Sequence, residues 1–380
     1  MNIVLSDAGK HLRFAPLSLT RPIGNLRIGI LTNDERWKLL IPNSSIFYET
    51  EDYLTYKFLI TSKEDIKINA TVIPDKKLAQ TILELKDGDE LFVKETWIAK
   101  KGIIIDRKIE YKDSVIILEN SWDIFQKNAE VLILDFDLIT SNRKSQSISN
   151  SNKIIGNPEL IFIEQGAKIE ASILNTNSGP IYIGKDAEIM EGTMIRGPLA
   201  LCEKAEIKMG AKIYGATTIG PYCKVGGEVS NVVFQSYSNK GHDGFLGNSI
   251  IGEWCNLGAD TNSSNLKNNY SKVNVYSYES NSFQKTDIQF MGLVMGDHSK
   301  CGINTMFNTA TIVGMSANIY GGDFPPKYIP SFSWGGSSGF DRFELSKAIQ
   351  AAKAMMSRRE VYFSDGDLKI FQFLNTKLDK

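Results

Sequence analysis

An apolar residue recurs at every sixth position through the middle of the chain. The residue four places after each of these positions is small in nearly every case, Leu199 being the exception. A period of six matches neither a helix, which repeats about every 3.6 residues, nor a strand, which repeats every two. It is typical of a parallel β-helix, in which each hexapeptide supplies one strand and one corner. The predicted interior positions are Ile183, Ile189, Ile195, Leu201, Ile207, Ile213, Ile219 and Val225, then Met295, Cys301, Phe307, Val313 and Ile319.

Two boundaries frame this predicted solenoid. We expect it to begin near Lys153, because Ile163 and Ile169 already keep the six-residue spacing, and the polar residues 140–152 are interpreted as a linker. Residues 340–360 are rich in helix formers and predict a C-terminal helix that caps or crosses the end of the solenoid. The apolar residues at helical spacing in this segment are Phe343, Ile349, Ala352 and Met356.

The first 140 residues follow a different pattern. Apolar runs such as "AEVLILDFD" alternate with mixed segments, which predicts a small α/β domain. The predicted organisation is therefore an α/β domain over residues 1–150, a parallel β-helix over 151–334 and a helical tail over 335–380.

Composition narrows the class of protein. The formal net charge is −1, which argues against a nucleic-acid or membrane-surface protein that binds through bulk charge. The four cysteines form no CxxC pair, and we expect them to be reduced. No apolar run approaches the roughly 18 residues of a membrane span, and no signal peptide is evident, so we expect a cytoplasmic location.

The six-residue spacing is interrupted between Val225 and Met295, and polar residues gather in this interval. Interruptions of a solenoid commonly build its binding face. The interval contains "SNKGHDGFLG", which carries His242 between glycines, and it offers a carboxylate in Glu228. These groups predict a site for acid–base chemistry and substrate binding, the alternative being a solvated turn. His298, in "VMGDHSKCG", is expected at the surface.

Three segments of this interval resemble a known family. "NKGHDGFLGN", "NLGADT" and "SSNLKN" are similar in sequence and spacing to K-A-G-H-x-x-Y-L-G-D, N-[IL]-G-A-G-T and T-x-N-Y-D-G. These motifs belong to the bacterial bifunctional N-acetylglucosamine-1-phosphate uridyltransferase/glucosamine-1-phosphate acetyltransferase family. The resemblance implies a left-handed β-helix with three hexapeptides per coil, a homotrimer, and acetyl-CoA as the acyl donor.

The resemblance also implies roles for particular residues. His242 falls on the general base that deprotonates the substrate amine, and Glu228 falls on the carboxylate that orients the imidazole. Asn256 and Asn265 fall on residues that hold substrate or intermediate. Ala259 lies in the segment whose backbone approaches acetyl-CoA.

Three residues that contact the substrate phosphate in the family, one tyrosine and two basic residues, are replaced in this chain. Phe245 stands where the family has tyrosine, and Ser230 and Tyr214 stand where it has basic residues. The resemblance thus implies a retained acid–base centre with a rewritten phosphate clamp. The remaining candidates for binding the substrate are Arg196, which lies one coil before Tyr214, Lys240, and Lys272 with a one-residue shift.

A second resemblance lies near the N-terminus. "AGKHLRFAPLSLTRP" is similar to the G-x-G-T-R-[LFM]-x-P-L-T-x-x-x-P-K loop of sugar-1-phosphate nucleotidyltransferases, although His11 replaces a glycine and Ile23 the lysine. Arg13 and Arg21 are the candidate nucleotide-binding residues. The family implies Mg²⁺ as a cofactor if this domain is active. Its candidate ligands are either Asp87 and Asp89 or Asp135 and Asp137, and the sequence does not choose between these pairs.

These features together predict an acyl-CoA-dependent N-acyltransferase that acts on an amino-sugar phosphate or a sugar nucleotide, in sugar-nucleotide or cell-envelope metabolism. Two alternatives stay open. One is a sugar-1-phosphate nucleotidyltransferase whose β-helix serves for trimerisation. The other is a non-catalytic trimer that binds sugar nucleotides. The identities of the sugar, the nucleotide and the acyl chain are left open.

Overall fold

The computed structural model describes residues 1–61 and 63–377, and it begins with an α/β domain. One six-stranded sheet runs in the order β2-β1-β3-β6-β5-β7, in which β1 lies parallel to β2 and β3, and β6 is antiparallel to its neighbours. The strands are β1 (Asn2–Ser6), β2 (Ser45–Glu49), β3 (Ile66–Asn69), β5 (Asp89–Val93), β6 (Thr96–Lys100) and β7 (Arg107–Glu110). A small pair is formed by β4 (Val72–Ile73) and β8 (Ile116–Ile117), and the helices are α1 (Asn33–Leu40), α2 (Lys76–Leu83), α3 (Asp123–Gln126) and α4 (Asn128–Thr140).

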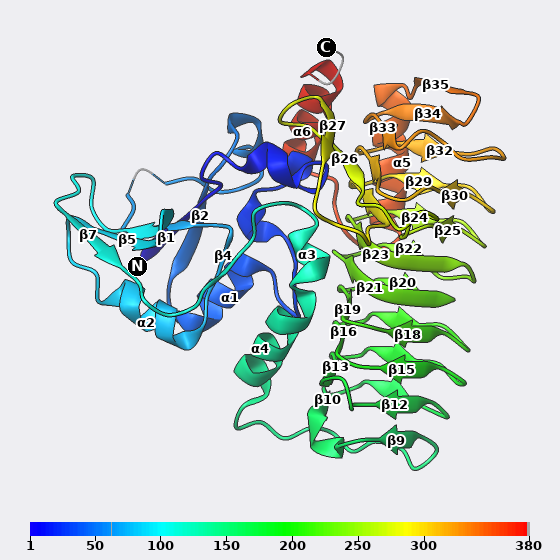
Figure 1. Cartoon of the computed structure of the whole chain (residues 1–380), viewed down its shortest axis with the longest axis horizontal. Helices are drawn as coiled ribbons and strands as arrows, with labels where there is room; N and C mark the ends of the chain where they lie inside the picture. Colours follow the sequence, from blue (N-terminus) through cyan, green and yellow to red (C-terminus); the bar gives the residue numbers. More distant parts are fainter. Residues whose placement is uncertain (62, 378–380) are drawn as a thin grey trace.

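From Lys153 the chain winds into a parallel β-helix with three faces (Figure 1). Face A contains β10 (Ile161–Ile163), β13 (Ile181–Ile183), β16 (Leu199–Leu201), β19 (Thr217–Ile219), β28 (Leu293–Met295), β31 (Thr311–Val313) and β33 (Tyr328–Ile329). Face B contains β11 (Lys168–Ile169), β14 (Glu188–Ile189), β17 (Glu206–Ile207), β20 (Lys224–Val225), β22 (Asn239–Lys240), β24 (Asn256–Leu257), β29 (Lys300–Cys301), β32 (Asn318–Ile319) and β34 (Ser333–Gly336). Face C contains β9 (Lys153–Ile155), β12 (Ile173–Asn175), β15 (Met194–Arg196), β18 (Lys212–Tyr214), β25 (Asn262–Ser263) and β30 (Met306–Phe307).

The parallel β-helix and its interior residues are confirmed. Every predicted interior position is buried, and these side chains form one hydrophobic core along the axis of the solenoid. Each residue pairs with the equivalent residue of the next coil, as in the register of Ile189 with Ile207 and of Ile207 with Val225. The six-residue period therefore arises because each hexapeptide contributes one inward-facing residue to each face in turn.

The predicted break between Val225 and Met295 is largely wrong, because coiling continues to Ser263. The strands β21 (Glu228–Phe234) and β23 (Phe245–Ile251) each run around the corner from face C to face A. The interior residue Val229 comes only four positions after Val225, and Phe234 comes five positions after Val229. These shorter corners change the phase of the pattern without opening the solenoid.

The real excursion covers residues 265–292. It contains the antiparallel hairpin of β26 (Asn274–Ser277) and β27 (Ser282–Lys285), which lies against β31. Stacking of Tyr276 on Tyr328, with ring centroids 3.5 Å apart, holds the hairpin on face A. Its tip reaches the α/β domain, where Glu279 pairs with Arg13.

The C-terminal segment forms two helices where one was predicted. β34 pairs with β35 (Gly339–Arg342), and the helices α5 (Leu345–Ser357) and α6 (Asp365–Lys377) follow. Figure 1 shows both beside the later coils. Ala352 and Met356 of α5 are buried as expected, and α6 reaches back to the α/β domain, where Phe373 stacks on Tyr53 at 4.2 Å.

The α/β domain is seated on face A of the solenoid. Apolar residues of α4 meet Phe162, Ala200 and Cys202 of face A. Gln235 accepts a hydrogen bond from the Arg27 amide at 2.7 Å, and its own amide donates to the Arg27 carbonyl at 3.0 Å. In the part of the chain that the structure describes, no helix has the length and apolar character of a membrane span.

Candidate functional site

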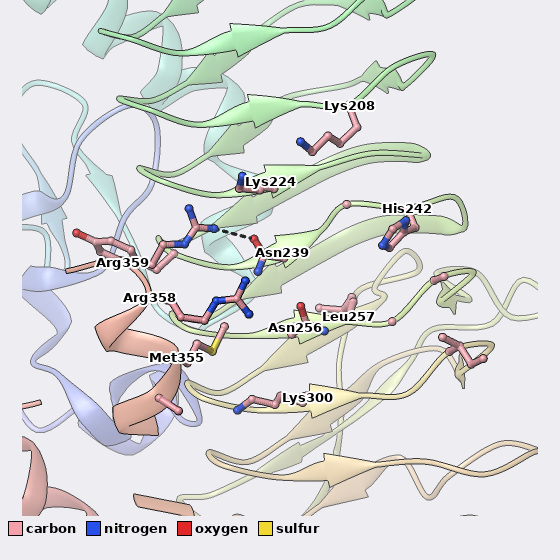
Figure 2. Close-up of a pocket in the computed structure, with 16 residues that line it drawn as sticks. Lys208, Lys224, Asn239, His242, Asn256, Leu257, Lys300, Met355, Arg358 and Arg359 are labelled. Atoms are coloured by element: carbon pink, nitrogen blue, oxygen red, sulfur yellow. Dashed lines mark hydrogen bonds between the residues drawn. The ribbon is translucent and has the colours of Figure 1, made fainter. Parts of the chain in front are cut away.

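A groove of about 830 Å³ runs between face B and helix α5 (Figure 2). Its floor is a ladder of outward side chains in register on successive strands, in which Lys224 pairs with Asn239, Asn239 with Asn256 and Asn256 with Lys300. One wall is the C-terminal end of α5. The groove residues drawn and labelled in Figure 2 are Lys208, Lys224, Asn239, His242, Asn256, Leu257, Lys300, Met355, Arg358 and Arg359.

The groove is strongly basic. Among its lining residues in the described chain, none is acidic. Glu206 lies close by and pairs with Lys208 at 2.5 Å and with Lys224 at 2.7 Å, so it neutralises only part of this charge. Arg359 reaches across the groove and donates to the side-chain oxygen of Asn239 at 3.3 Å. Such a groove suits a ligand that carries several negative charges.

His242 lies at one end of this groove, in the corner between faces B and C. It lines the basic groove and also a second cavity of about 800 Å³. The second cavity differs in character, since Met190, Met209, Asp243 and Asp260 contribute to it. The imidazole is exposed, and neither ring nitrogen has a hydrogen-bond partner among the residues that the structure describes. His242 therefore borders both cavities, as do Lys208, Gly241 and Ala259.

Glu228 is not in contact with His242 in this structure. Its carboxylate accepts a hydrogen bond from the Tyr214 hydroxyl at 2.6 Å and pairs with Lys212 at 3.2 Å. These two contacts lower the pKa of Glu228, the Tyr214 hydrogen bond having the larger effect. The carboxylate is therefore ionised at neutral pH but directed along face C, where Tyr214 replaces the basic residue of the family.

Lys240, a predicted substrate-binding residue, is buried inside the solenoid. Its side chain is 1% exposed and points into the solenoid, where the ammonium donates to three backbone carbonyls. A substrate in the groove does not reach these donors.

Of the other predicted substrate-binding and cofactor-binding residues, some line the groove and some lie outside it. Asn256 and Ala259 line the groove together with His242. Asn265 donates to Asn248 at 2.7 Å and lies outside it. Lys272 forms an exposed ion pair with Asp287, and Arg196 is exposed on face C.

The loop that resembles a nucleotide-binding loop is occupied by its own side chains. His11 is 3% exposed, and its ring nitrogens contact Asp7 at 2.7 Å and the Tyr53 hydroxyl at 3.3 Å. Arg13 is paired with two carboxylates, Glu119 at 3.8 Å and Glu279 at 3.3 Å. The imidazole that stands in place of the family's glycine is therefore buried within this loop, where Asp7 and Tyr53 hold it.

Arg21, the other candidate for nucleotide binding, is buried at the contact between the domains. It pairs with Glu253 at 2.7 Å and with Asp297 at 2.5 Å, both from the solenoid. Thr20 also donates to Asp297, at 2.6 Å. Arg21 thus joins the two domains, and its guanidinium is paired with carboxylates of the solenoid.

In each candidate pair of metal ligands, one aspartate is already paired with an arginine. Asp135 is buried against Arg36 and accepts hydrogen bonds from the amides of Ile30 and Leu31 at 2.8 and 3.1 Å. Asp89 is held by Arg107 at 2.7 Å. Within the described residues no cluster of three His, Cys, Asp or Glu side chains is suited to a metal ion. Asp89 and Asp135 as placed here therefore do not suit a Mg²⁺ ion, because an arginine already neutralises each of them.

The expectation that His298 lies at the surface is wrong. It is 7% exposed and belongs to a column of stacked rings at the corner between faces A and B. The column continues through Trp254 to Tyr237, whose centroids are 4.1 Å apart, and Phe371 of α6 meets the His298 ring edge-on at 5.1 Å. Burial, with a further contribution from Lys300, lowers the pKa of His298 to about 3.

We expect this buried histidine to make stability depend on pH. The unfolded chain binds a proton at His298 near pH 6.5 and the folded chain only near pH 3, so stability falls as the pH drops from 6.5 towards 3. Between pH 7 and pH 5 the loss should be about 2 kcal/mol, measured by urea unfolding. The His298→Phe variant should lose less over the same interval, and an equal loss in both proteins would contradict this assignment.

Measuring above pH 5 avoids the pH range in which the buried carboxylate Glu253 changes the stability. Burial of Glu253 raises its pKa, but the Arg21 guanidinium outweighs this effect and the pKa falls to about 2. Its contribution is therefore lost only below its ordinary value of 4.5.

Comparisons with known proteins agree with this architecture. Residues 3–144 match the sugar nucleotidyl transferase family. A bifunctional sugar-1-phosphate nucleotidylyltransferase/acetyltransferase of Sulfurisphaera tokodaii is 28% identical over 310 residues, which cover 76% of this chain and 74% of that protein. The bifunctional protein GlmU of Synechococcus elongatus is 22% identical over 245 residues, which cover 58% of this chain and 50% of GlmU, so the chain spans about half the length of that relative.

A solved structure also aligns with part of the chain. The polySia specific acetyltransferase NeuO is 12% identical, with 55% of this chain and 100% of NeuO covered at a TM-score of 0.33. The family match lies over the α/β domain, and the similarity to the curated relatives extends into the solenoid. Over most of its length the chain is thus similar to GlmU-like bifunctional transferases, with a region that matches sugar nucleotidyl transferases followed by a parallel β-helix.

Proposed function

We propose that this chain is a coenzyme A-dependent N-acyltransferase in which His242 is the general base. The observation that carries the proposal is the position of His242, at which a basic groove and a second cavity meet. A transfer reaction between two substrates needs this arrangement, because donor and acceptor must approach one proton acceptor from different directions. The acceptor class is an amine-bearing sugar phosphate or sugar nucleotide.

The basic groove suits the acyl donor. Coenzyme A carries a diphosphate and a 3′-phosphate, and the groove offers ammonium groups on face B and two guanidinium groups at the end of α5. Arg358 and Arg359 provide forked donors that match phosphate oxygens, while Lys224 supplies a point charge. The resemblance places Ala259 near acetyl-CoA, and this residue lines both cavities beside His242.

The chemistry follows from this placement. The acceptor nitrogen attacks the thioester carbonyl, so a C–N bond forms, and His242 takes the amine proton. When the tetrahedral intermediate collapses, the C–S bond breaks and the imidazolium returns the proton to the leaving thiolate. Protons balance, and no metal ion is required by this sequence of steps.

The homotrimer implied by the resemblance is part of the proposal, and light scattering should give the mass of three chains.

Removing groove cations should weaken binding of the donor. In titration calorimetry with coenzyme A, we expect Lys224→Ala and Arg358→Ala each to raise Kd about 10-fold, the value of one charge-assisted hydrogen bond. Binding by the native protein should also weaken as salt is added. Lys153→Ala, an exposed change on a distant coil of face C, is the control and should leave Kd unchanged.

The reaction itself is tested by release of free thiol from acetyl-CoA in the presence of amino-sugar phosphates or amino-sugar nucleotides. The four cysteines of the protein are all buried, so they add little background to a thiol reagent. Thiol release that needs both substrates supports the proposal. Failure of coenzyme A to bind, or equal affinity in the groove variants and the control, would overturn it.

A further inference from the structure

One interior position of the solenoid is occupied by a lysine. Lys240 stands in register with Val225 on the preceding coil, at the second position of its strand, where face B otherwise turns apolar residues such as Ile207 and Leu257 inward. The side chain is 1% exposed, among the largest fully buried side chains of the described chain. A lysine at such a position is unusual, because lysine is almost never fully buried without a partner.

The ammonium of Lys240 uses all three of its donors on backbone oxygens. It donates to the carbonyl of His242 at 2.7 Å, of Asp243 at 3.2 Å and of Gly226 at 3.1 Å. The first two acceptors belong to the turn that carries His242, and the third belongs to the coil before it. The lysine therefore ties the histidine turn to the body of the solenoid from inside.

Main-chain hydrogen bonds hold the end of this turn, since the Glu228 amide donates to the Gly244 carbonyl at 3.2 Å and the Phe245 amide donates to the Asn262 side chain at 2.8 Å. The His242 carbonyl itself is held by Lys240. Gly241 has open space where a side chain would be, and Gly244 has a left-handed φ of +109°. The Asp260 amide donates to the Asp243 carbonyl at 3.1 Å, but the His242 side chain has no hydrogen bond within the described structure. The direction of the imidazole thus depends on the main chain at residue 242, which Lys240 contacts directly.

Stability alone does not account for this lysine. Removing an ammonium from water costs several kcal/mol, and no carboxylate among the described residues pairs with Lys240. Burial accordingly lowers its pKa to about 8. An aliphatic residue would fill the same interior position without this cost, as it does in the neighbouring coils.

We infer that Lys240 is a positioning residue, which holds the His242 turn so that the imidazole faces the point at which the two cavities meet. The inference rests on the proposed function in one respect, namely that His242 is the base. It assigns Lys240 a role without contact to either substrate. The role requires the hydrogen bonds of the ammonium and not the bulk of its alkyl chain.

Lys240→Met tests this role, since methionine fills the space of the alkyl chain without a donor. We expect kcat for acyl transfer to fall about 10- to 100-fold, the cost of a small misplacement of a reacting group. KM for acetyl-CoA should stay within about 3-fold of the native value, because Lys240 does not line the groove. The melting temperature should be unchanged or higher. Leu246→Met, at the next interior position, is the matched control and should retain native kcat.

A second measurement does not depend on activity. The chain has only three histidines, and His11 and His298 are buried, so imidazole resonances from nitrogen-15-labelled histidine separate the exposed His242 from two internal references. In Lys240→Met we expect the His242 signals to shift and sharpen as the turn becomes mobile, while the other two stay in place.

The outcomes separate the two proposals. Unchanged His242 signals with unchanged kcat would overturn the positioning role, and so would loss of the His11 and His298 signals, which would show that Lys240 supports folding instead. If His242→Ala keeps full acyl transfer, the proposed function fails. The mobility of the His242 ring in Lys240→Met would still decide whether the lysine orders the turn.

Discussion

Replacing His242 by alanine is expected to lower kcat for acyl transfer by about 10²- to 10⁴-fold, the usual contribution of a general base. The imidazole lies where the groove and the second cavity meet, and no other imidazole in the chain is exposed. The attacking amine would then lose its proton to water alone. Release of thiol from acetyl-CoA at saturating acceptor measures the effect.

Two controls make this result specific. His242→Ala should bind coenzyme A with nearly native affinity, because the phosphates are assigned to groove cations and not to the histidine. His242→Gln keeps a polar side chain of similar reach without basicity and should be as inactive as the alanine variant. Activity within about 3-fold of native in either variant would exclude His242 as the base.

The largest effect on stability is expected from Asp135→Asn. Asp135 and Arg36 are both 0% exposed and form a two-point ion pair, with distances of 2.7 and 2.8 Å. Removing one charge leaves the guanidinium buried without its partner, which costs about 3–5 kcal/mol. Because the chain has two domains, unfolding of the α/β domain should be followed by amide hydrogen exchange within that domain rather than by a global probe.

Asp137→Asn is the control for this substitution. It lies on the same helix two residues further on, it is exposed, and its change should alter stability by less than about 0.5 kcal/mol. Equal destabilisation by the two variants would contradict the assignment of the buried pair. The comparison also separates structural from metal-binding roles, because added Mg²⁺ should stabilise neither protein.

The sequence predicted the solenoid well because its signal is local and repeated. Every sixth residue from Ile183 to Val225 is aliphatic, and each of these positions independently predicts a side chain that points into the solenoid. The prediction failed between Val225 and Met295, where corners one or two residues shorter shift the phase of the pattern. The interior residues Val229 and Phe234 were present in the printed sequence, but a fixed spacing of six passes over them.

The candidate site was predicted only in part, for a related reason. Motif similarity identified the turn of His242 and the neighbouring Asn256 and Ala259, which the structure brings together in one groove. It did not identify Arg358 and Arg359, which carry no motif. Their only signal was a pair of arginines at the end of a predicted helix, and that signal does not say which face of the solenoid the helix covers.

The sequence by itself determined the coil, the inward residues and the turn that presents His242, because these depend on contacts repeated within one or two coils. Only the tertiary structure decided what surrounds that turn. It turned Glu228 towards Tyr214, buried Lys240 beneath the turn, and brought the end of α5 to face B from more than 100 residues away. The physical reason is that the direction of a side chain depends on the phase of its coil, and the groove depends on packing between segments that are distant in the sequence. A local sequence pattern contains neither kind of information.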